Sequence, residues 1–591
     1  MRADIMGSEI RLKKQKWVVA AKRADFQGIG KKFQIDPVIA RIIRNRGLTE
    51  LSQIDRYLYG ERKDLYDPHL LKDAGKGAEI IRKKIEMHKK IRIIGDYDID
   101  GVEASYILIR ALRRCGADVD VAIPDRMKDG YGINQNLIET AYEAGVDTIL
   151  TCDNGIAAAE PIRMAKEMGM TVIVTDHHDI PKELAKADAV VNPKQSDCPY
   201  PFKGLCGAAV AFKFVQLLYE QMGIPVEEAD EFLENVGFAT VGDVMDLQDE
   251  NRILVKIGLE MLNHTKNLGM RALILQNQLQ PGELKAHHIG FRIGPCLNAS
   301  GRLDTAQRSL RLLLSEDALE AGTLAAELVS LNEERKDMTA LAVEDAKRVI
   351  SENGMEKDKV LVVFLPDCHE SLAGIVAGRI REQYDRPALV LTRGEESAKG
   401  SGRSVECYSM FEELQKCDDL LLKYGGHPMA AGFSLEEAKI PEFRRRLNEN
   451  TTLTWEDLTP KVVIDVPMPV DYVSEGLIQQ LDCLEPFGKG NEKPAFADHD
   501  LEICSAKIFG KNGSVVRLQL KSKHGTVRDA VYFGEPENLE LSIAEKYGKV
   551  VAEAVMHGKR QPGVRMHFMY YPEINSYRGN ESIQLRITGF C

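Results

Sequence analysis

Five short apolar runs, separated by segments with helical apolar spacing, dominate residues 91–191 of the chain. They are IRII (91–94), VDVAI (119–123), TILT (148–151), TVIVT (171–175) and AVV (189–191). Runs so short and so continuously apolar are typical of parallel strands that helices cover on both faces. The segments 103–115, 134–144 and 159–168 supply those helices. The pattern therefore predicts a doubly wound α/β domain built on a parallel sheet.

Acidic and histidine side chains follow three of the predicted strands. IIGDYDIDG contains Asp96, Asp98 and Asp100, LTCDNG contains Asp153, and VTDHH contains Asp176, His177 and His178. The carboxyl ends of parallel strands line the ligand crevice of an open sheet, so we expect these side chains to converge. One more carboxylate, Asp243 of ATVGDVMDL, comes from the following helical region and can close the site.

Five of these carboxylates, those of Asp96, Asp98, Asp100, Asp153 and Asp243, need compensating cations if they converge, because like charges raise one another's pKa. Two divalent ions would nearly neutralise the group. Carboxylate oxygens suit Mg²⁺ or Mn²⁺, and an imidazole among the ligands favours Mn²⁺. Taken singly, an aspartate at a strand end is more often a turn residue or a helix cap. Taken together on successive strand ends, these residues predict a site for two Mn²⁺ or Mg²⁺ ions.

Two further clusters combine glycine with arginine. GPCLNASGRLD (294–304) and GSGRS (400–404) can place backbone N–H groups and an arginine fork around phosphate oxygens. YGGHPMAAG (424–432) adds Gly426 and His427 beside a small-residue turn. The alternative for each cluster is an ordinary loop whose arginine pairs with a surface carboxylate. Beside a metal site, their joint presence favours a phosphate ester as substrate.

Sequence patterns in the rest of the chain predict further domains. Residues 207–316 are mostly helical, and 316–350 are predicted to form one long helix that spans two bodies. A second α/β unit follows, with strands at 360–364 and 388–392 and helices near 371–384, 409–423 and 441–449. After the linker 454–461, residues 462–590 have the alternating pattern of a small β-barrel. The predicted boundaries are 1–74 for an N-terminal extension, 75–315, 316–353 for the connecting helix, 354–455, and 456–591.

Charge and cysteine content exclude several classes of protein. With 78 basic and 90 acidic residues the net charge is −12, so overall charge cannot hold a polyanion and any nucleic-acid contact must use local positive surface. The 11 cysteines include no C-x-x-C pair, which argues against a disulfide framework and a zinc ribbon. Because the sequence has neither a long apolar span nor the apolar core of a signal peptide near its start, we expect a cytoplasmic protein without membrane contact.

Residues 503–528 form a local basic stripe in this acidic chain. The stripe contains no acid and carries Lys507, Lys511, Arg517, Lys521, Lys523 and Arg528. On a strand pair of the barrel it can follow a nucleic-acid backbone, with Phe509 and His524 available for stacking. A solvated strand face is the alternative.

In this order, these motifs resemble the DHH family of phosphoesterases, in its branch of bacterial single-strand-specific exonucleases. The resemblance includes GDYDIDG, TCDNG, TDHH, VGDVMDL, GPCLNASGRL, HESLAGIVAGRI (369–380), GSGRS and YGGHPMAAG. LEPFGKGNEKPAF (484–496) is similar to the segment that leads into the family's oligonucleotide-binding (OB) barrel. The implied architecture is a DHH domain, a long connecting helix, a DHH-associated domain and an OB barrel.

The resemblance also implies roles for individual residues. The implied metal ligands are Asp96, Asp98, Asp100, Asp153, His177 and Asp243. Asp153 is the candidate bridging ligand, His178 faces the scissile phosphate together with Arg302, and Asp176 orients its neighbours. Many relatives carry a histidine two residues before the first aspartate, where this chain has Ile94. The departure implies either that Asp96 replaces the missing ligand or that one ion binds weakly.

The implied activity is a 5′-to-3′ exonuclease that releases 5′-mononucleotides from single-stranded DNA, in repair and recombination, through attack of metal-activated water. Arg126, Ser401 and Arg403 are the predicted readers of a 5′-terminal phosphate. Expected partners are single-stranded DNA, a single-strand-binding protein and a DNA helicase, and the chain is expected to be a monomer. The alternatives are a DHH phosphoesterase of small phosphoesters or very short oligonucleotides, and a non-catalytic scaffold. The barrel with its basic stripe favours a long polynucleotide, and the retained ligands favour an enzyme.

Overall fold

The computed structural model describes residues 15–126, 130, 132–510, 513–577 and 579–591 of the chain. The chain separates into two compact units. One, here the barrel unit, comprises Met1–Leu58, Thr459–Glu485 and Glu492–Cys591. The other, here the two-sheet unit, comprises Tyr59–Leu458 and Pro486–Asn491.

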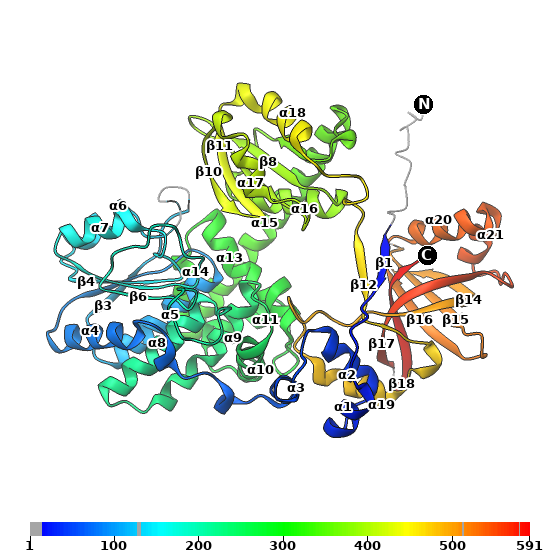
Figure 1. Ribbon diagram of the computed structural model, residues 1–591, viewed down its shortest axis with the longest axis horizontal. Helices are drawn as coiled ribbons and strands as arrows, with labels where there is room; N and C mark the ends of the chain where they lie inside the picture. Colours follow the sequence, from blue (N-terminus) through cyan, green and yellow to red (C-terminus); the bar gives the residue numbers. More distant parts are fainter. Residues whose placement is uncertain (1–14, 127–129, 131, 511–512, 578) are drawn as a thin grey trace. The chain divides into compact units, whose positions relative to one another are not determined.

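The first sheet of the two-sheet unit is fully parallel, as predicted. Its strands are β2 (Ile91–Ile94), β3 (Val119–Ala122), β4 (Thr148–Cys152), β5 (Thr171–Thr175) and β6 (Ala189–Val191), in the order β3-β2-β4-β5-β6. Helices α4 (Ala74–Glu86), α5 (Ile99–Arg114) and α8 (Gly207–Met222) cover one face, and α6 (Gln135–Glu143) and α7 (Ala159–Glu167) cover the other (Figure 1). The strand order reverses between β2 and β4, so the ligand crevice of such a sheet lies at their carboxyl ends.

Helices fill the middle of this unit. They are α9 (Leu233–Gly242), α10 (Asp249–Asn263), α11 (Leu268–Gln276), α13 (Gly294–Leu303), α14 (Gln307–Leu314) and α15 (Ala318–Glu352). The first half of α15 buries Leu324 and Leu328 in one core, and its second half buries Ala346 and Ile350 in another. The predicted long helix that serves two bodies is therefore confirmed.

The second sheet is mixed. Its strands are β7 (Leu361–Phe364), β8 (Ala388–Arg393), β9 (Ala398–Arg403), β10 (Leu421–His427) and β11 (Ala430–Leu435), in the order β10-β11-β9-β8-β7. The pair β7–β8 is parallel, and the other three described pairs of this sheet are antiparallel. Helices α16 (Ala373–Tyr384) and α18 (Ile440–Asn450) match two of the predicted helices.

The helix predicted at 409–423 is wrong beyond α17 (Met410–Gln415). From Leu421 onward the chain pairs with β11 as strand β10. The apolar run at 420–422 is too short for its periodicity to separate a strand from a helix, so pairing with another strand decided the outcome.

Both glycine–arginine clusters lie on regular elements, not in the ordinary loops of the alternative interpretation. Residues 400–404 fall on and just after β9, where Gly400 and Gly402 leave room for the side chains of Phe433 and Met410. Residues 294–303 form α13, which follows a π-helix at Ile289–Ile293. A Cβ on Gly301 would lie 2.2 Å from the Tyr97 carbonyl oxygen. The glycines of these segments therefore serve close packing, which local sequence does not reveal.

The barrel unit contains a closed β-barrel, as predicted. Its strands are β14 (Phe496–Phe509), β15 (Val515–Lys521), β16 (Val527–Phe533), β17 (Arg565–Tyr577) and β18 (Asn580–Phe590). They pair in the order β14-β15-β16-β18-β17, and β17 pairs back with β14 to close the barrel. Helices α20 (Pro536–Tyr547) and α21 (Lys549–Met556) connect β16 to β17.

The N-terminal part of the chain belongs to the same unit as the barrel. Strand β1 (Lys16–Val19) pairs in parallel with β12 (Lys461–Ile464), which precedes the barrel. Helices α1 (Phe26–Phe33) and α2 (Pro37–Asn45) follow β1, and α19 (Glu475–Leu481) follows β12. Segments from the two ends of the chain therefore build this unit together.

Two further expectations concerned disulfide bonds and membrane-spanning helices. All eleven cysteines are free thiols. Within the described ranges, none of the helices combines the length and the apolar character that a bilayer crossing requires.

Candidate metal centre and phosphate pocket

The strand-end carboxylates and histidines converge at the switch point of the parallel sheet. Ligand atoms lie within 4.8 Å of one another in three overlapping groups: Asp96, Asp98 and Asp153; Asp100, His177 and Asp243; and Asp153, His177 and His178. The His177 Nε2 atom lies 3.0 Å from Asp153 Oδ1, 3.5 Å from Asp100 Oδ2 and 3.7 Å from Asp243 Oδ2. Asp153 and His177 each belong to two groups, so they stand at the centre of the cluster.

An unusual backbone turn places Asp153 at the end of β4. Asp153 has φ 61°, a left-handed conformation that few non-glycine residues adopt and that is found preferentially at functional sites. The side chain of Asn154 supports the turn by donating from Nδ2 to the carbonyl oxygens of Ile94 and Cys152 at 3.0 and 2.9 Å. A Cβ on Gly207 would lie 2.6 Å from the Asp153 Cβ. Sequence reasoning missed Asn154 and Gly207, although Asn154 is part of the motif TCDNG.

Two of the aspartates also cap helices. Asp100 accepts hydrogen bonds from the backbone N–H groups of Gly207 at 2.5 Å and Ala208 at 2.8 Å, at the start of α8. Asp98 is the N-cap of α5 and accepts from the N–H groups of Asp100 and Gly101. The positive ends of two helix dipoles therefore point at the cluster and partly offset its negative charge.

The carboxylates remain under strong mutual repulsion. Burial, followed by repulsion from Asp100 and Asp98, raises the pKa of Asp153 well above its usual value. Burial and the same two neighbours raise the pKa of Asp243 to about 8. Among the described residues, Asp96 Oδ1 and His177 Nδ1 are buried without a hydrogen-bond partner. Burial lowers the pKa of His177, so its imidazole is neutral and suited to bind a metal. This set of hard oxygens and one neutral imidazole fits Mn²⁺ or Mg²⁺.

Asp176 organises the histidine pair. Its Oδ1 accepts hydrogen bonds from the N–H groups of His177 and His178 at 2.7 and 3.0 Å and lies 2.8 Å from His178 Nδ1. Its Oδ2 accepts from the N–H of Ile156 at 2.9 Å. Burial opposes the charged form of His178, but the hydrogen bond to Asp176 and the nearby carboxylates raise its pKa to about 9. Asp176 thus holds His178 as a cation beside the cluster.

Ile94 lies outside the ligand cluster. It is the last residue of β2 and is fully buried in the apolar core that also contains Ile138 and Val174. The group of ligand atoms nearest to β2 therefore consists of the three carboxylates Asp96, Asp98 and Asp153.

A cavity of about 480 Å³ lies in the same unit, lined by residues of both sheet domains. The parallel-sheet domain contributes Tyr97 and Arg126, and the Arg126 guanidinium lies over the Tyr97 ring at 5.0 Å. The mixed sheet contributes Ser401 and a glycine strip, in which Gly425 pairs with Gly432 and Gly432 pairs with Ser401. Among the described residues, nothing lies within 4 Å of a Cβ built on either glycine. A planar group can therefore lie flat on these strands, a feature that sequence reasoning missed.

Two arginines beside this cavity have no carboxylate to pair with in the part of the chain that the structure describes. Arg302 Nη1 donates to the Ser371 carbonyl at 2.9 Å, and Arg403 Nη1 donates to the Gly402 carbonyl at 2.8 Å. Burial, then the positive charges of Arg126 and Arg335, lower the pKa of Arg302 to about 10. Burial and Arg126 likewise lower the pKa of Arg403. Uncompensated arginines that repel one another are suited to bind an anion.

Gly426 and His427 lie at the end of β10, in the hairpin with β11. Gly426 has φ 146°, and the His427 side chain is 63% exposed. His427 Nδ1 lies 3.6 Å from Asp179 Oδ2, and Asp179 directly follows the histidine pair of the parallel sheet. The hairpin therefore reaches the neighbourhood of the cluster from the side of the mixed sheet.

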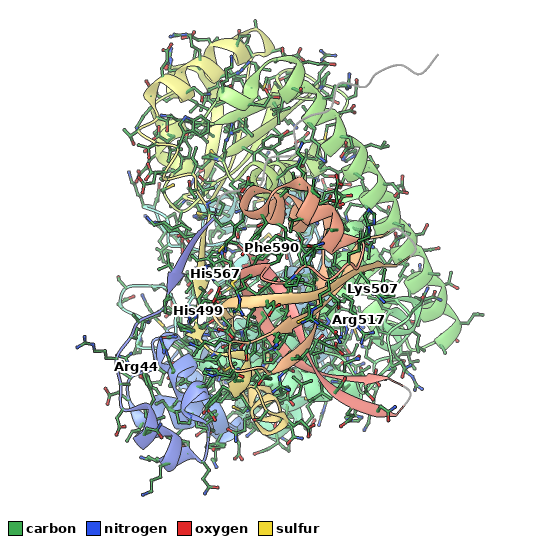
Figure 2. All side chains as sticks on the ribbon, turned by 90° about the vertical axis from the view of Figure 1, so that its right-hand side faces the viewer. Arg44, His499, Lys507, Arg517, His567 and Phe590 are labelled. Carbon is green, nitrogen blue, oxygen red and sulfur yellow. The ribbon has the colours of Figure 1, made fainter. Side chains whose placement is uncertain are left out.

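The basic stripe lies on the barrel strands β14 and β15. Lys507 and Arg517 are paired on neighbouring strands, and both are exposed (Figure 2). Two acids from outside the stripe lie beside it: Arg517 Nη2 lies 3.2 Å from Asp529 Oδ2, and Lys521 lies opposite Glu502 on the neighbouring strand. The remaining stripe residues differ in position: Lys523 lies in the turn after β15, Arg528 donates to the Val473 carbonyl, and Lys511 lies outside the described residues.

Comparisons with known proteins match all three domains. Residues 90–239 match the DHH family, N-terminal domain, residues 357–452 match the DHHA1 domain, and residues 464–589 match the RecJ OB domain. The single-stranded-DNA-specific exonuclease RecJ of Bacillus subtilis is 35% identical over 91% of this chain and 68% of its own length. The protein of the same name from Haemophilus influenzae is 31% identical over 95% of this chain and 97% of its own. A crystal structure of RecJ from Thermus thermophilus in complex with Mn²⁺ matches with a TM-score of 0.79 and 28% identity, over 98% of this chain and 79% of that one.

A doubly wound sheet with carboxylates and histidines at its switch point, joined by a long helix to a DHHA1 domain, is the arrangement of the DHH class. The match of the barrel to the RecJ OB domain narrows this class. The chain belongs to the RecJ family of single-stranded-DNA-specific exonucleases.

Proposed function

We propose that this protein is a metal-dependent exonuclease that removes 5′-mononucleotides from single-stranded DNA in the 5′-to-3′ direction, in DNA repair and recombination. The observation that carries the proposal is the joint presence, in one compact unit, of a cluster suited to divalent metals and a cavity beside uncompensated arginines. The first suits hydrolysis of a phosphodiester, and the second suits binding of its phosphates.

The residues in and beside the cluster would have different roles in binding metal and phosphate. Asp96, Asp98, Asp100, Asp153, His177 and Asp243 would hold one or two Mn²⁺ or Mg²⁺ ions. When bound, the ions supply an activated water and neutralise phosphoryl charge. Asp153, shared by two groups of ligand atoms, is the natural bridging ligand. His178, whose Nδ1 lies 2.8 Å from Asp176 Oδ1, would face an oxygen of the scissile phosphate. Arg302, buried and without a carboxylate partner among the described residues, can bind the same phosphate.

Direction requires a group that reads a chain end, because a metal cluster alone does not distinguish the two polarities. Arg126, Ser401 and Arg403 would bind the dianionic 5′-terminal phosphate, and the glycine strip would carry the terminal nucleotide. Gly374 leaves room for the Arg403 side chain, since a Cβ on Gly374 would lie 2.8 Å from the Arg403 Nη2 atom. Gly426 and His427 of the β10–β11 hairpin would contact the substrate near Asp179.

The barrel would bind the part of the strand that has not yet been cut, through Lys507, Lys511, Arg517, Lys521 and Lys523. A DHH phosphoesterase acting on small phosphoesters is the second candidate, since it would need the same metal cluster. It would not need an OB-type barrel, which suits an extended single strand. A single-strand-binding protein and a helicase as partners, and a monomeric state, stay predictions from the sequence.

The proposal is tested with single-stranded oligonucleotides labelled at either end and incubated with Mn²⁺, Mg²⁺ or a chelator. We expect a 5′ label to appear in mononucleotides at the earliest times, a 3′ label to remain in long products, and the chelator to stop both. Release of a 3′-labelled mononucleotide first would contradict the direction. Equal cleavage of duplex DNA would contradict the single-strand specificity, and turnover in excess chelator would contradict the need for metal.

A further inference from the structure

A hexapeptide on the approach to the barrel belongs to the two-sheet unit. Pro486–Asn491 is part of this unit, although the chain on both sides of it belongs to the barrel unit. Gly488 and Asn491 exchange two backbone hydrogen bonds at 3.0 and 3.1 Å, with Lys489 and Gly490 between them. The buried Asn491 side chain donates from Nδ2 to the Pro486 carbonyl at 2.8 Å. The hexapeptide is therefore a closed, internally braced turn.

The turn packs on the loop that leads from Asp243 to α10, here the Asp243 loop (residues 243–249). The Leu247 N–H donates to the Lys489 carbonyl at 2.8 Å, and Gln248 Nε2 donates to the Gly490 carbonyl at 3.1 Å. Lys489 Nζ lies 3.2 Å from Asp246 Oδ1. Three consecutive residues of the loop are therefore bound to two residues of the turn.

Both glycines of the turn are needed at this contact. A Cβ on Gly488 would lie 2.6 Å from Leu247 Cδ1. A Cβ on Gly490 would lie 3.1 Å from Asp246 Cβ, and Gly490 also has φ 72°, which favours glycine. An added methyl group on either glycine therefore requires Leu247 or Asp246 to shift.

The Asp243 loop depends on outside support for its shape. Val244 has φ 56° and Asp249 has φ 46°, conformations that are uncommon without glycine and rarest for a β-branched residue. Strained residues persist only where their surroundings over-determine them. Val244 is 61% exposed and so has little packing of its own. The contacts at 246–248, including those of the turn, therefore stabilise the loop.

We infer that Pro486–Asn491 is a positioning element for Asp243, which fixes this carboxylate in the metal centre by holding residues 246–248 of the loop behind it. The inference rests on the proposed function, since it presumes that Asp243 binds metal. The chain continues from both ends of the hexapeptide into the barrel unit. The segment that supports the loop behind Asp243 is therefore covalently continuous with the barrel unit.

The test is a Mn²⁺ titration of the full-length protein without DNA, followed by electron paramagnetic resonance of the free ion. Gly490→Ala is expected to weaken Mn²⁺ binding by about tenfold, as for other residues that orient metal ligands. Lys489→Ala and Asp246→Asn should each give a smaller loss, and the double variant should be no weaker than the single ones, because both remove one ion pair. Lys489→Arg should restore the parent affinity.

Lys493→Ala is the matched control, since Lys493 lies two residues after the hexapeptide, and its ammonium group lies over the Tyr571 ring within the barrel unit. It should bind Mn²⁺ like the parent. Circular dichroism verifies that each variant folds. If Gly490→Ala does not fold, Lys489→Ala still tests the inference, because it puts no side chain on a glycine of the turn.

Asp153→Ala in the same titration separates the two possible failures. If the parent and Asp153→Ala bind Mn²⁺ equally, the proposed metal centre itself is wrong. If Asp153→Ala loses binding while Gly490→Ala and Lys489→Ala bind like the parent, the positioning role is overturned and the proposed function stands.

Discussion

The two sheets of the two-sheet unit present opposite chemistry. The parallel sheet ends in aspartates and histidines whose pKa values are shifted by burial and by one another's charges. The mixed sheet presents glycine and serine to the cavity and carries Arg403, which has no acid to pair with among the described residues. One sheet is therefore suited to hold cations, and the other to hold phosphate. We therefore expect cleavage and recognition of the chain end to be separable, so that a substitution can impair one and leave the other intact.

The largest expected effect is on the acidic side of this comparison. Asp153→Ala should lower turnover by more than about a hundredfold, beyond the roughly 10–100-fold typical of residues that only orient metal ligands. Binding of single strands should survive, because the arginines and the barrel are untouched. Steady-state cleavage in saturating Mn²⁺ and a fluorescence binding titration measure the two effects. Asp147→Ala is the control, since Asp147 precedes the opposite end of β4 and pairs with Lys84. Turnover above a hundredth of the parent rate would remove Asp153 from its bridging role.

The second effect belongs to the mixed sheet. Arg403→Ala should reduce the preference for 5′-phosphate over 5′-hydroxyl ends by about 1.5–3 kcal/mol, the contribution of a charge-assisted hydrogen bond. Rates on matched oligonucleotides with the two ends measure it. Arg393→Ala is the control from the same sheet, because Arg393 is exposed and paired with Glu437 at 2.7 Å. An unchanged ratio between the two ends would show that Arg403 does not read the terminus.

The third effect is on the free energy of unfolding, and it concerns Glu103 in the domain of the parallel sheet. Glu103 is fully buried on α5, where Asn235 Nδ2 donates to its Oε2 at 2.7 Å, and burial raises its pKa to about 8. The folded protein therefore keeps a proton that the unfolded chain releases near its ordinary pKa of 4.5. Stability from this group is full below that value and is lost as the pH rises towards 8.

Glu103→Gln should remove this loss of stability at rising pH, because glutamine has no proton to release. Between about pH 5 and pH 9, the free energy of unfolding of the variant should rise relative to that of the parent by about 1 kcal/mol or more. Urea unfolding at several pH values measures the difference. Parallel pH profiles for parent and variant would mean that folding does not raise the pKa of Glu103.

The smallest effect tests whether phosphate binding extends to the barrel. Replacing Lys507, Lys521 and Lys523 with alanine should flatten the salt dependence of long-strand binding, by a log–log slope of about 0.7 for each lost phosphate contact. Cleavage of a very short oligonucleotide should be spared. Lys31 and Lys32, which are exposed on α1 of the barrel unit, provide the control pair. An unchanged slope would assign the stripe to a solvated strand face.

Sequence patterns predicted the parallel sheet, because each strand is a short apolar run and each helix has its own periodicity. The same reasoning placed Asp96, Asp153 and His177 together, since residues at strand ends meet at one edge whatever their distance in the chain. It did not predict which glycines serve close packing. Gly301 and Gly400 lie in a helix and a strand, and each is needed by a neighbour from elsewhere in the fold.

The amino-acid pattern alone predicts which residue types follow which strand, and hence that carboxylates and imidazoles gather at one edge of a parallel sheet. Local patterns suffice for this, because alternation and strand ends are properties of neighbouring residues. The folded structure was needed to show that the Gly207 N–H donates to Asp100, that Arg302 and Arg403 lack acidic partners among the described residues, and that Pro486–Asn491 packs on the loop behind Asp243. These are contacts between residues far apart in the chain, and close packing, which no local pattern encodes, selects them.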